Sequence, residues 1–435
     1  MTVHLTKRTR MKTSTTRTIA KVITLSLLTA TALHATNGDN LIGVGAKSRA
    51  MGGTGVALGH GAESAFTNPA TITEIEGTEI SFGGTLFMPD ITTGIDSTPF
   101  GGSQEVFKSD ADTNIIPSVS IASQINENWF IGAGMWGTAG MGVDFRNANG
   151  AILNNFGMVT NLQLLQFGVP IAYKTSGLSI GVTPILQYGN LDINYNAPGS
   201  PFNGEGLSQD FGLGWQAGLT YDFGEVGVQG LSLGLTYKSA IEMEYDGQFT
   251  TGDPTNPTGA MDAFGLALEN GNTLEQPEEY SVGIAYGMGA HTFAFDYKKI
   301  NWSKASGYGD FGWEDQDVYA FGYEFQATGW AIRLGYNYSS SAVVELGTSP
   351  VDPTNATLNM LNLLGFPATQ EHHYTFGGTY EFSEMFSADL AYVYAPTSTK
   401  TFDTFLATSP TTGVPSTITN THSEDSFTFQ FNFKF

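Results

Sequence analysis

Three basic residues of this chain, Lys238, Lys298 and Arg333, have side chains that could bind a carboxylate. Lys238 and Arg333 alternate with apolar neighbours and so fall on the polar face of an extended segment, and Lys298 is expected to do the same. Each could equally pair with an acidic group of the chain, and we favour this pairing because 41 Asp and Glu face only 18 Lys and Arg. The acidic candidates are Asp222, Glu242 and Glu244.

We find no sequence motif that is typical of a catalytic site, a metal site or a cofactor site. The stretch from Gly43 to Ser48 contains a lysine but not the Gly-x-x-x-x-Gly-Lys-Ser/Thr spacing of a phosphate-binding loop. His372 and His373 are adjacent and would point to opposite faces of a strand, so they cannot chelate one metal together. The absence of cysteine excludes thiol catalysis and thiolate ligands. We expect a protein that is not an enzyme and has no catalytic, metal or cofactor-binding residues.

The first 35 residues have the features of a secretory signal peptide. Six basic residues and no acidic one precede an apolar stretch from Val22 to Leu33, and cleavage after Ala32 or after Ala35 would follow small residues. The apolar stretch is too short to cross a bilayer as a helix. Removing residues 1–35 leaves 12 basic and 41 acidic residues, a formal charge of −29. We therefore expect an exported protein for which nucleic acid is not a partner.

The composition of the whole chain points to strands that cross a membrane. Only 14% of residues are charged, against about 25% in a usual soluble domain, while 12% are aromatic and 54 are glycine. No run of about 20 apolar residues follows the signal, so we expect no membrane-spanning helix. Transmembrane barrels combine these properties, because lipid-facing residues alternate with polar ones along each strand.

The end of the chain shows that alternation most clearly. From Phe427 to Phe435 every odd position is Phe and every even position is polar. Successive side chains of a strand point to opposite faces, so such a strand has one aromatic and one hydrophilic face. Segments 211–223, 231–245 and 330–339 repeat the pattern, and the second of them includes Ile241, Met243 and Tyr245.

Segments with this pattern predict an all-β, antiparallel transmembrane barrel of about fourteen strands, with a barrel domain at 78–435. The predicted strands lie near 78–90, 112–124, 128–138, 159–174, 177–195, 210–223, 229–245, 277–288, 290–303, 314–326, 329–340, 371–382, 385–396 and 424–435. Tight joins alternate with long connections at 196–209, 246–276, 341–370 and 397–423, as periplasmic turns alternate with extracellular loops.

Residues 36–77 do not follow the strand pattern. They are rich in glycine and alanine and contain Asn68, Pro69 and Ala70 as a continuous Asn-Pro-Ala box. Pro69 would fix the backbone, and Asn68 would supply hydrogen bonds. A segment of this kind before the first strand could fold back to plug the lumen, or it could be a periplasmic tail outside the barrel.

The stretch from Gly45 to Ala57, followed by Ser64–Ala70, resembles the N-terminal plug of the FadL/TodX family of outer-membrane hydrophobic-compound transporters. The stretch from Gln276 to Ser303 and the hairpin from Tyr319 to Tyr338 are similar to parts of the same family. The resemblance implies a fourteen-stranded barrel in the bacterial outer membrane with residues 36–77 as a plug and Asn68, Pro69 and Ala70 as the plug motif. A strand that ends on Phe435 resembles the signal by which the barrel-assembly machinery recognises such proteins.

The resemblance also implies uptake of hydrophobic small molecules by passive, plug-gated passage with lateral exit into the membrane. Long-chain fatty acids are the first expectation for the cargo. The alternatives are an uptake channel for aromatic hydrocarbons, or a general porin or structural barrel. The expected surroundings are outer-membrane lipid and lipopolysaccharide, and the protein is expected to act as a monomer.

Overall fold

The computed structural model describes most of the chain after the expected signal peptide, which lies outside the described residues. The described ranges are 37–96, 98, 103–147, 155–197, 200–203, 206–250, 266, 268–349, 351–404 and 416–435. Within them no helix is long and apolar enough to cross a membrane.

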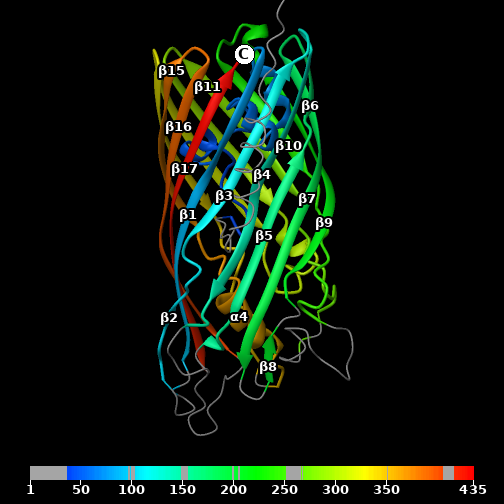
Figure 1. Cartoon of the computed structure of the whole chain (residues 1–435), viewed down its shortest axis with the longest axis vertical. Helices are drawn as coiled ribbons and strands as arrows, with labels where there is room; N and C mark the ends of the chain where they lie inside the picture. Colours follow the sequence, from blue (N-terminus) through cyan, green and yellow to red (C-terminus); the bar gives the residue numbers. More distant parts are fainter. Residues whose placement is uncertain are drawn as a thin grey trace, which may run out of the picture.

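Fourteen antiparallel strands form a closed barrel, which confirms the predicted fold class (Figure 1). The wall consists of β1 (Thr78–Asp96), β3 (Asn114–Gln124), β4 (Trp129–Asp144), β5 (Val159–Gly168) with its continuation β6 (Ile171–Thr175), β7 (Leu178–Ala197), β9 (Ser208–Asp222), β10 (Leu231–Lys238), β11 (Glu279–Met288), β12 (His291–Ile300), β13 (Gln316–Ala327), β14 (Trp330–Ser339), β15 (His372–Ser383), β16 (Phe386–Asp403) and β17 (Thr417–Lys434). The short strands β2 (Phe107–Lys108) and β8 (Ser200–Asn203) extend this wall locally. Closure comes from β1 and β17, which pair from Glu79–Lys434 to Asp96–Thr417.

The two faces of the wall follow the alternation in the sequence. On β17, the rings of Phe427, Phe429 and Phe431 are exposed on the outside of the barrel, whereas Gln430 and Asn432 are buried inside it. An apolar outer face suits a bilayer, and a polar inner face supplies hydrogen bonds to whatever fills the lumen. His372 and His373 behave as expected for adjacent strand residues, since His373 is fully buried and His372 bonds Tyr336 at 2.8 Å.

One predicted strand is wrong in its second half. We predicted 229–245, but β10 ends at Lys238. Ile241, Met243 and Tyr245 are each at most 1% exposed, and they pack inside the barrel instead of facing the membrane. A period-two apolar pattern has the same appearance whether its apolar side meets lipid or a core, so the pattern did not reveal the turn.

Most other strands are as predicted, but several are longer. β1, β4, β16 and β17 each extend beyond their predicted ranges at the end of the barrel away from the tight turns. We call that end the α4 end, because it holds the helix α4 (Thr354–Gly365) in a region predicted as a long loop. The opposite end, which carries the C-terminus and the tight turns, is called the turn end (Figure 1).

The N-terminal segment, residues 37–77, lies inside the ring of strands in the turn-end half of the barrel (Figure 1). It forms the short helix α2 (Ala46–Ala50) and two 3-10 helices, η1 (Ala62–Phe66) and η2 (Pro69–Glu74). Inward side chains of the wall accept hydrogen bonds from its backbone: Gln430 from Ala46, and Asp296 from Gly55 at 2.7 Å. Buried backbone groups need such partners, and the polar inner face provides them.

Candidate functional site

The α4 end of the barrel contains a large apolar cluster, whereas the apolar clusters elsewhere on the inner face of the wall are small. Its members come from α4, from the inner faces of long strands and from the connections after β10, β12 and β14. They include Ile91, Met141, Phe145, Met158, Ile193, Tyr195, Ile241, Met243, Tyr245, Phe249, Trp302, Tyr308, Phe311, Trp313, Leu361, Leu364, Phe366 and Phe402, all buried. We call this group the apolar cluster.

Helix α4 is oriented in this cluster by a stripe of asparagines. Asn355, Asn359 and Asn362 are spaced so that they lie along one side of the helix. Asn359 donates to the carbonyls of Leu346 and Asp403, and Asn362 donates to the carbonyl of Phe311 at 2.9 Å. The polar stripe is thereby satisfied within the lumen, and leucines such as Leu361 and Leu364 remain for the cluster.

Aromatic rings form the part of the cluster nearest the N-terminal segment. Trp302 makes edge contacts with Tyr308 and Trp313, with ring centroids 4.7 and 5.2 Å apart. Trp313 donates its indole N–H to Asn362 of α4 at 3.1 Å. The apolar cluster is therefore continuous from α4 to the centre of the barrel.

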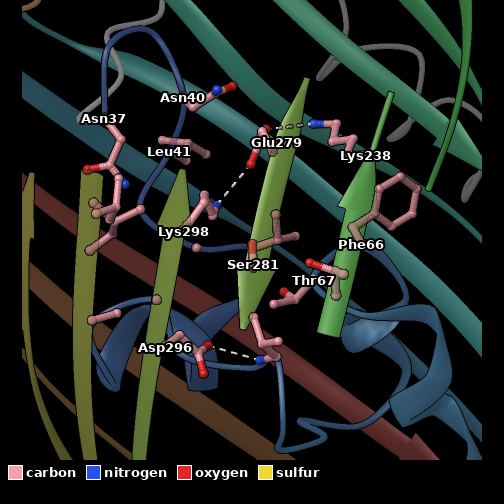
Figure 2. Close-up of a pocket in the computed structure, with 18 of the residues that line it drawn as sticks. Asn37, Asn40, Leu41, Phe66, Thr67, Lys238, Glu279, Ser281, Asp296 and Lys298 are labelled. Atoms are coloured by element: carbon pink, nitrogen blue, oxygen red, sulfur yellow. Dashed lines mark hydrogen bonds and ion pairs between the residues drawn. The ribbon is translucent and has the colours of Figure 1, made fainter. Parts of the chain in front are cut away.

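Between the apolar cluster and the turn end, the N-terminal segment and strands β4, β5 and β9 to β14 enclose a cavity of about 70 Å³ (Figure 2). Apolar side chains such as Leu41 and Phe66 also line it, but we call it the polar cavity because of the polar groups that it buries. This volume holds roughly five water molecules. Buried polar atoms that lack a partner among the described residues line the cavity: Asn37 Oδ1 and Nδ2, Asn40 Nδ2, Thr138 Oγ1, Gln216 Oε1, Asp296 Oδ1 and Asn337 Oδ1. Such groups need hydrogen-bond partners that an apolar molecule cannot supply, which makes the cavity a poor place for one.

Two of the three predicted carboxylate contacts lie in this cavity. Lys238 and Lys298 lie on either side of Glu279, with their ammonium groups 3.4 and 3.2 Å from its carboxylate oxygens (Figure 2). Both lysines pair within the protein, but their partner is Glu279 instead of Asp222, Glu242 or Glu244. The strand register decides this, because β11 places Glu279 opposite Lys238 on one side and Ser281 opposite Lys298 on the other.

Arg333 lies apart from the two lysines, near the turn end. Its guanidinium contacts the Glu324 carboxylate at 2.6 Å and donates to the Thr379 hydroxyl at 2.7 Å. It lines an open vestibule together with Lys47, Glu79, Glu381 and Lys434. This mouth is polar and charged, in contrast to the α4 end.

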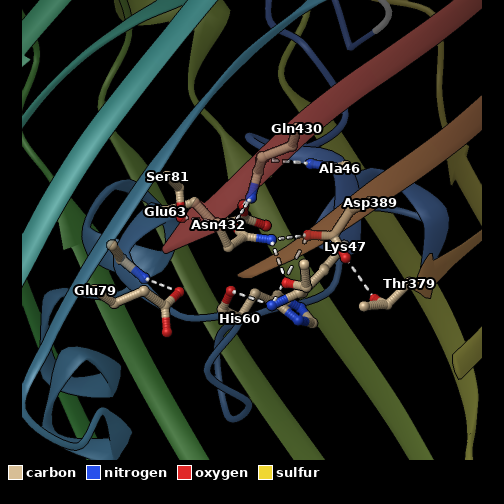
Figure 3. Close-up of polar contacts among 12 residues, drawn as sticks. Ala46, Lys47, His60, Glu63, Glu79, Ser81, Thr379, Asp389, Gln430 and Asn432 are labelled. Carbon is tan, nitrogen blue, oxygen red and sulfur yellow. Dashed lines mark hydrogen bonds and ion pairs between the residues drawn. The ribbon is translucent and has the colours of Figure 1, made fainter. Parts of the chain in front are cut away.

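On the lumen side of that vestibule, a polar network bonds the N-terminal segment to the wall (Figure 3). Asp389 on β16 accepts from Asn432 at 2.6 Å and lies 3.9 Å from the Lys47 ammonium. Gln430 donates to Glu63, which is fully buried. Burial raises the pKa of Glu63 to about 8, so this carboxyl is mainly neutral at pH 7.

The Asn-Pro-Ala box lies at the start of η2, against the wall. Asn68 accepts from the Ala70 N–H at 2.9 Å and donates to the Val56 carbonyl at 2.6 Å, and Pro69 takes the first helical position. Two glycines of the wall allow the close approach. A side chain at Gly218 would collide with the Asn68 amide, and one at Gly181 would come within 2.5 Å of the Pro69 carbonyl carbon.

The wall has a seam between β3 and β4 at the level of the polar cavity. The ladder between these strands runs from Gln124–Phe130 only as far as Ser118–Trp136, whereas β4 continues to Asp144. A register shift at Gly137–Ala139 distorts β4 at the same place. The first described residues of the N-terminal segment pair with this edge: Asn40 bridges Ala139, and two backbone hydrogen bonds of 3.0 Å flank the bridge. No pattern in the sequence predicted this seam.

Metal chemistry is not supported within the described ranges, where no group of three or more His, Cys, Asp or Glu side chains could hold a metal ion. The barrel instead has an apolar cluster at the α4 end and a charged vestibule at the turn end. The polar cavity lies between them, and the seam between β3 and β4 is at the level of that cavity.

Comparison with known proteins agrees with this architecture. A family model described as outer membrane protein transport protein (OMPP1/FadL/TodX) matches residues 26–435. The long-chain fatty acid transport protein of Escherichia coli is 25% identical over 394 residues, covering 80% of this chain and 83% of that protein. The 47 kDa outer membrane protein of Pasteurella multocida is 23% identical over 379 residues, covering 80% and 84%.

Solved structures show the same fold. The toluene transporter TodX of P. putida has a TM-score of 0.64 at 19% identity, covering 91% of this chain and 99% of that structure. A FadL homologue of Pseudomonas aeruginosa also has a TM-score of 0.64, at 15% identity, and covers 92% of this chain and all of that structure.

Proposed function

The chain belongs to the OMPP1/FadL/TodX family of outer-membrane transport proteins, and from that premise we propose that it takes up hydrophobic compounds, most of all long-chain fatty acids. The apolar cluster at the α4 end is the observation that carries this proposal. Each methylene moved from water into such surroundings contributes about 0.8 kcal/mol, so a long acyl chain has a large driving force to enter. The transport is passive, with the concentration gradient as its energy source.

Aromatic hydrocarbons are a second candidate cargo. The observation in their favour is the group of rings formed by Trp302, Tyr308, Phe311 and Trp313 within the cluster. Aromatic pairs contribute about 0.5–1.5 kcal/mol beyond the burial of their area, so this part of the cluster suits a ring better than a chain. The carboxylate of a fatty acid would instead seek a polar partner at the edge of the cluster.

The exit is through the seam between β3 and β4, into the membrane. A straight path to the turn end would take an apolar molecule through the polar cavity and past the charged groups of the vestibule, such as Lys47 and Arg333. The seam lies beside that cavity and opens toward lipid once residues 37–41 move away from β4. The N-terminal segment is in this proposal the gate as well as the plug, and Asn68, Pro69 and Ala70 are its anchor.

The test of the cargo is extraction of the purified protein and mass spectrometry of the molecules that remain bound. Leu361→Asp places a charge in the apolar cluster and should reduce retained fatty acid at least about tenfold. Val351→Asp is the matched control, because Val351 precedes α4 and is 90% exposed. Retention of toluene in preference to fatty acid would favour the second candidate, and reproducible capture of a polar solute would contradict both.

A further inference from the structure

Asp39 lies at the tip of the turn with which the N-terminal segment begins. Asn37 and Asn40 pair across this turn, and the Asp39 side chain between them is fully buried. Its Oδ2 accepts hydrogen bonds from the Gln276 amide at 2.8 Å and from the Tyr308 hydroxyl. Gln276 precedes β11 and Tyr308 follows β12, so one carboxylate receives donors from two separate connections.

The backbone of the same turn closes the seam on the other side of the lumen. The Asp39 carbonyl accepts from the Gly140 N–H, and the Leu41 N–H donates to the Thr138 carbonyl, both at 3.0 Å. In the ring of fourteen strands, β4 is five strands from β11, close to the opposite wall. The turn therefore bridges the barrel, with its backbone on β4 and its side chain on the far connections.

The position of Tyr308 is set by the aromatic part of the apolar cluster. Tyr308 packs against both Trp302 and Trp313, with ring centroids 4.7 Å from each. Gly38 lies directly against the Trp302 ring at φ +68°, and any side chain there would collide with the ring. The turn thus fits against these rings through Gly38 and bonds to them through Asp39.

We propose that Asp39, held by Tyr308 and Gln276, is the latch of the seam: while these hydrogen bonds are made, residues 37–41 stay paired with β4. The proposal rests on the seam being the exit for cargo. Tyr308 and Gln276 are positioning residues, because they act through Asp39 and not on the seam itself. Releasing the latch frees the turn without dismantling the rest of the N-terminal segment, which has its own anchors at Asp296, Gln430 and Asn68.

The absence of cysteine from the chain permits a direct test. Thr138→Cys places a thiol under the turn, where Thr138 is 8% exposed. Its rate of labelling by a water-soluble maleimide in the detergent-purified full-length protein reports opening of the seam. Tyr308→Phe removes the hydrogen bond that the Tyr308 hydroxyl donates to the buried Asp39 carboxylate, and it should speed this labelling about tenfold or more. Gln276→Met should do the same in a chain that keeps Tyr308.

Two controls make the result specific. Tyr297→Phe removes another tyrosine–aspartate bond, from Tyr297 to Asp317 at 2.6 Å on the wall, and should leave the labelling unchanged. Thr183→Cys lies at 0% exposure beside η1, where the Thr183 hydroxyl donates to the Ala65 carbonyl, so it reports loosening of the whole segment. The latch predicts faster labelling at position 138 and not at 183.

Unchanged labelling at position 138 in Tyr308→Phe and Gln276→Met would overturn the latch, as would an equal rise at both reporters. Because the assay contains no cargo, its outcome is independent of what the protein carries. Latch variants that label as predicted but leave uptake of every hydrophobic compound unchanged would instead contradict the proposed exit through the seam.

Discussion

Asp39 is a fully buried carboxyl group, and its ionisation should set how firmly residues 37–41 are held against β4. Burial raises its pKa from 3.8 to about 6, although the hydrogen bonds from Tyr308 and Gln276 and the charge of Lys238 oppose this, while Glu279 adds to it. A raised pKa means that the state in which residues 37–41 are paired with β4 favours the neutral acid. This pairing is therefore most stable at low pH and loses this stabilisation as the pH rises through about 6.

We predict that labelling of Thr138→Cys, corrected for the pH dependence of the thiol with the Thr183→Cys reporter, slows about tenfold from pH 7 to pH 5. Asp39→Asn keeps an acceptor oxygen but cannot titrate, so its corrected rate should be the same at both values. If the corrected labelling of the Thr138→Cys parent were faster at pH 5 than at pH 7, the charged form of Asp39 would be the one that closes the seam.

Single residues show what sequence reasoning can and cannot supply. The Asn68-Pro69-Ala70 box was identifiable because it resembles the plug motif of the FadL/TodX family. Its place at the start of η2 and the wall glycines that admit it, Gly181 and Gly218, were not predicted. The polar face of Lys238 followed from alternation. Its partner Glu279 did not, because cross-strand register depends on turn lengths that a sequence pattern leaves undetermined.

At the scale of elements, α4 is the piece that gives the lumen an apolar end, and its asparagine stripe should control its order. Asn362→Leu leaves the Trp313 indole N–H and the Phe311 carbonyl without their partner, at a cost of about 1–3 kcal/mol for each buried group. We expect amide hydrogen exchange in α4 to become at least about tenfold faster, with the strands unchanged.

Asn355→Leu is the matched control, because Asn355 bonds the Gly347 carbonyl at the exposed start of the helix. It should alter exchange in α4 by less than about threefold. Equal effects of the two substitutions would mean that the helix is held by its leucines alone and that the stripe has no orienting role.

Elements differ in how far the sequence predicts them. Strands such as β14 and β17 are long, amphipathic and bounded by tight turns, so their pattern is unambiguous. Helix α4 was missed because Thr354–Gly365 lies in a connection where Pro, Thr and Asn favour loops, and it is helical only where the barrel mouth buries it. The end of β10 was missed for a related reason: Ile241 and Met243 pack into the apolar cluster at the α4 end.

At the scale of the whole molecule, two parts of the chain occupy the lumen: the N-terminal segment and the apolar cluster at the α4 end. The N-terminal segment packs partly through apolar side chains, such as Phe66 and Ile72 against the inner face of β4. It is also bonded to the wall by side chains from β1, β12, β15 and β17, for example Thr375, which accepts from the Gly52 N–H at 3.0 Å. The filling at the α4 end packs mainly through apolar side chains. Ions are excluded by a continuous hydrogen-bonded filling, whereas an apolar packing can part around a molecule that replaces its contacts.

The N-terminal segment should therefore be the principal barrier to ions. Deleting residues 38–70 should leave the strands able to insert, because the wall closes through β1 and β17 without them, and should turn a quiet barrel into a conducting one. Asn68→Ala is the milder form: it removes the bonds to Ala70 and Val56, and we expect weaker seating and altered uptake with normal assembly. Planar-bilayer conductance measures both, and heat-modifiable mobility on a gel confirms that each barrel is folded. If the parent and the deleted protein both assemble and neither conducts, the packing at the α4 end alone seals the barrel, the N-terminal segment is not the plug, and an open porin is excluded. If both conduct steadily and equally, the parent is an open porin and plug-gated transport is excluded.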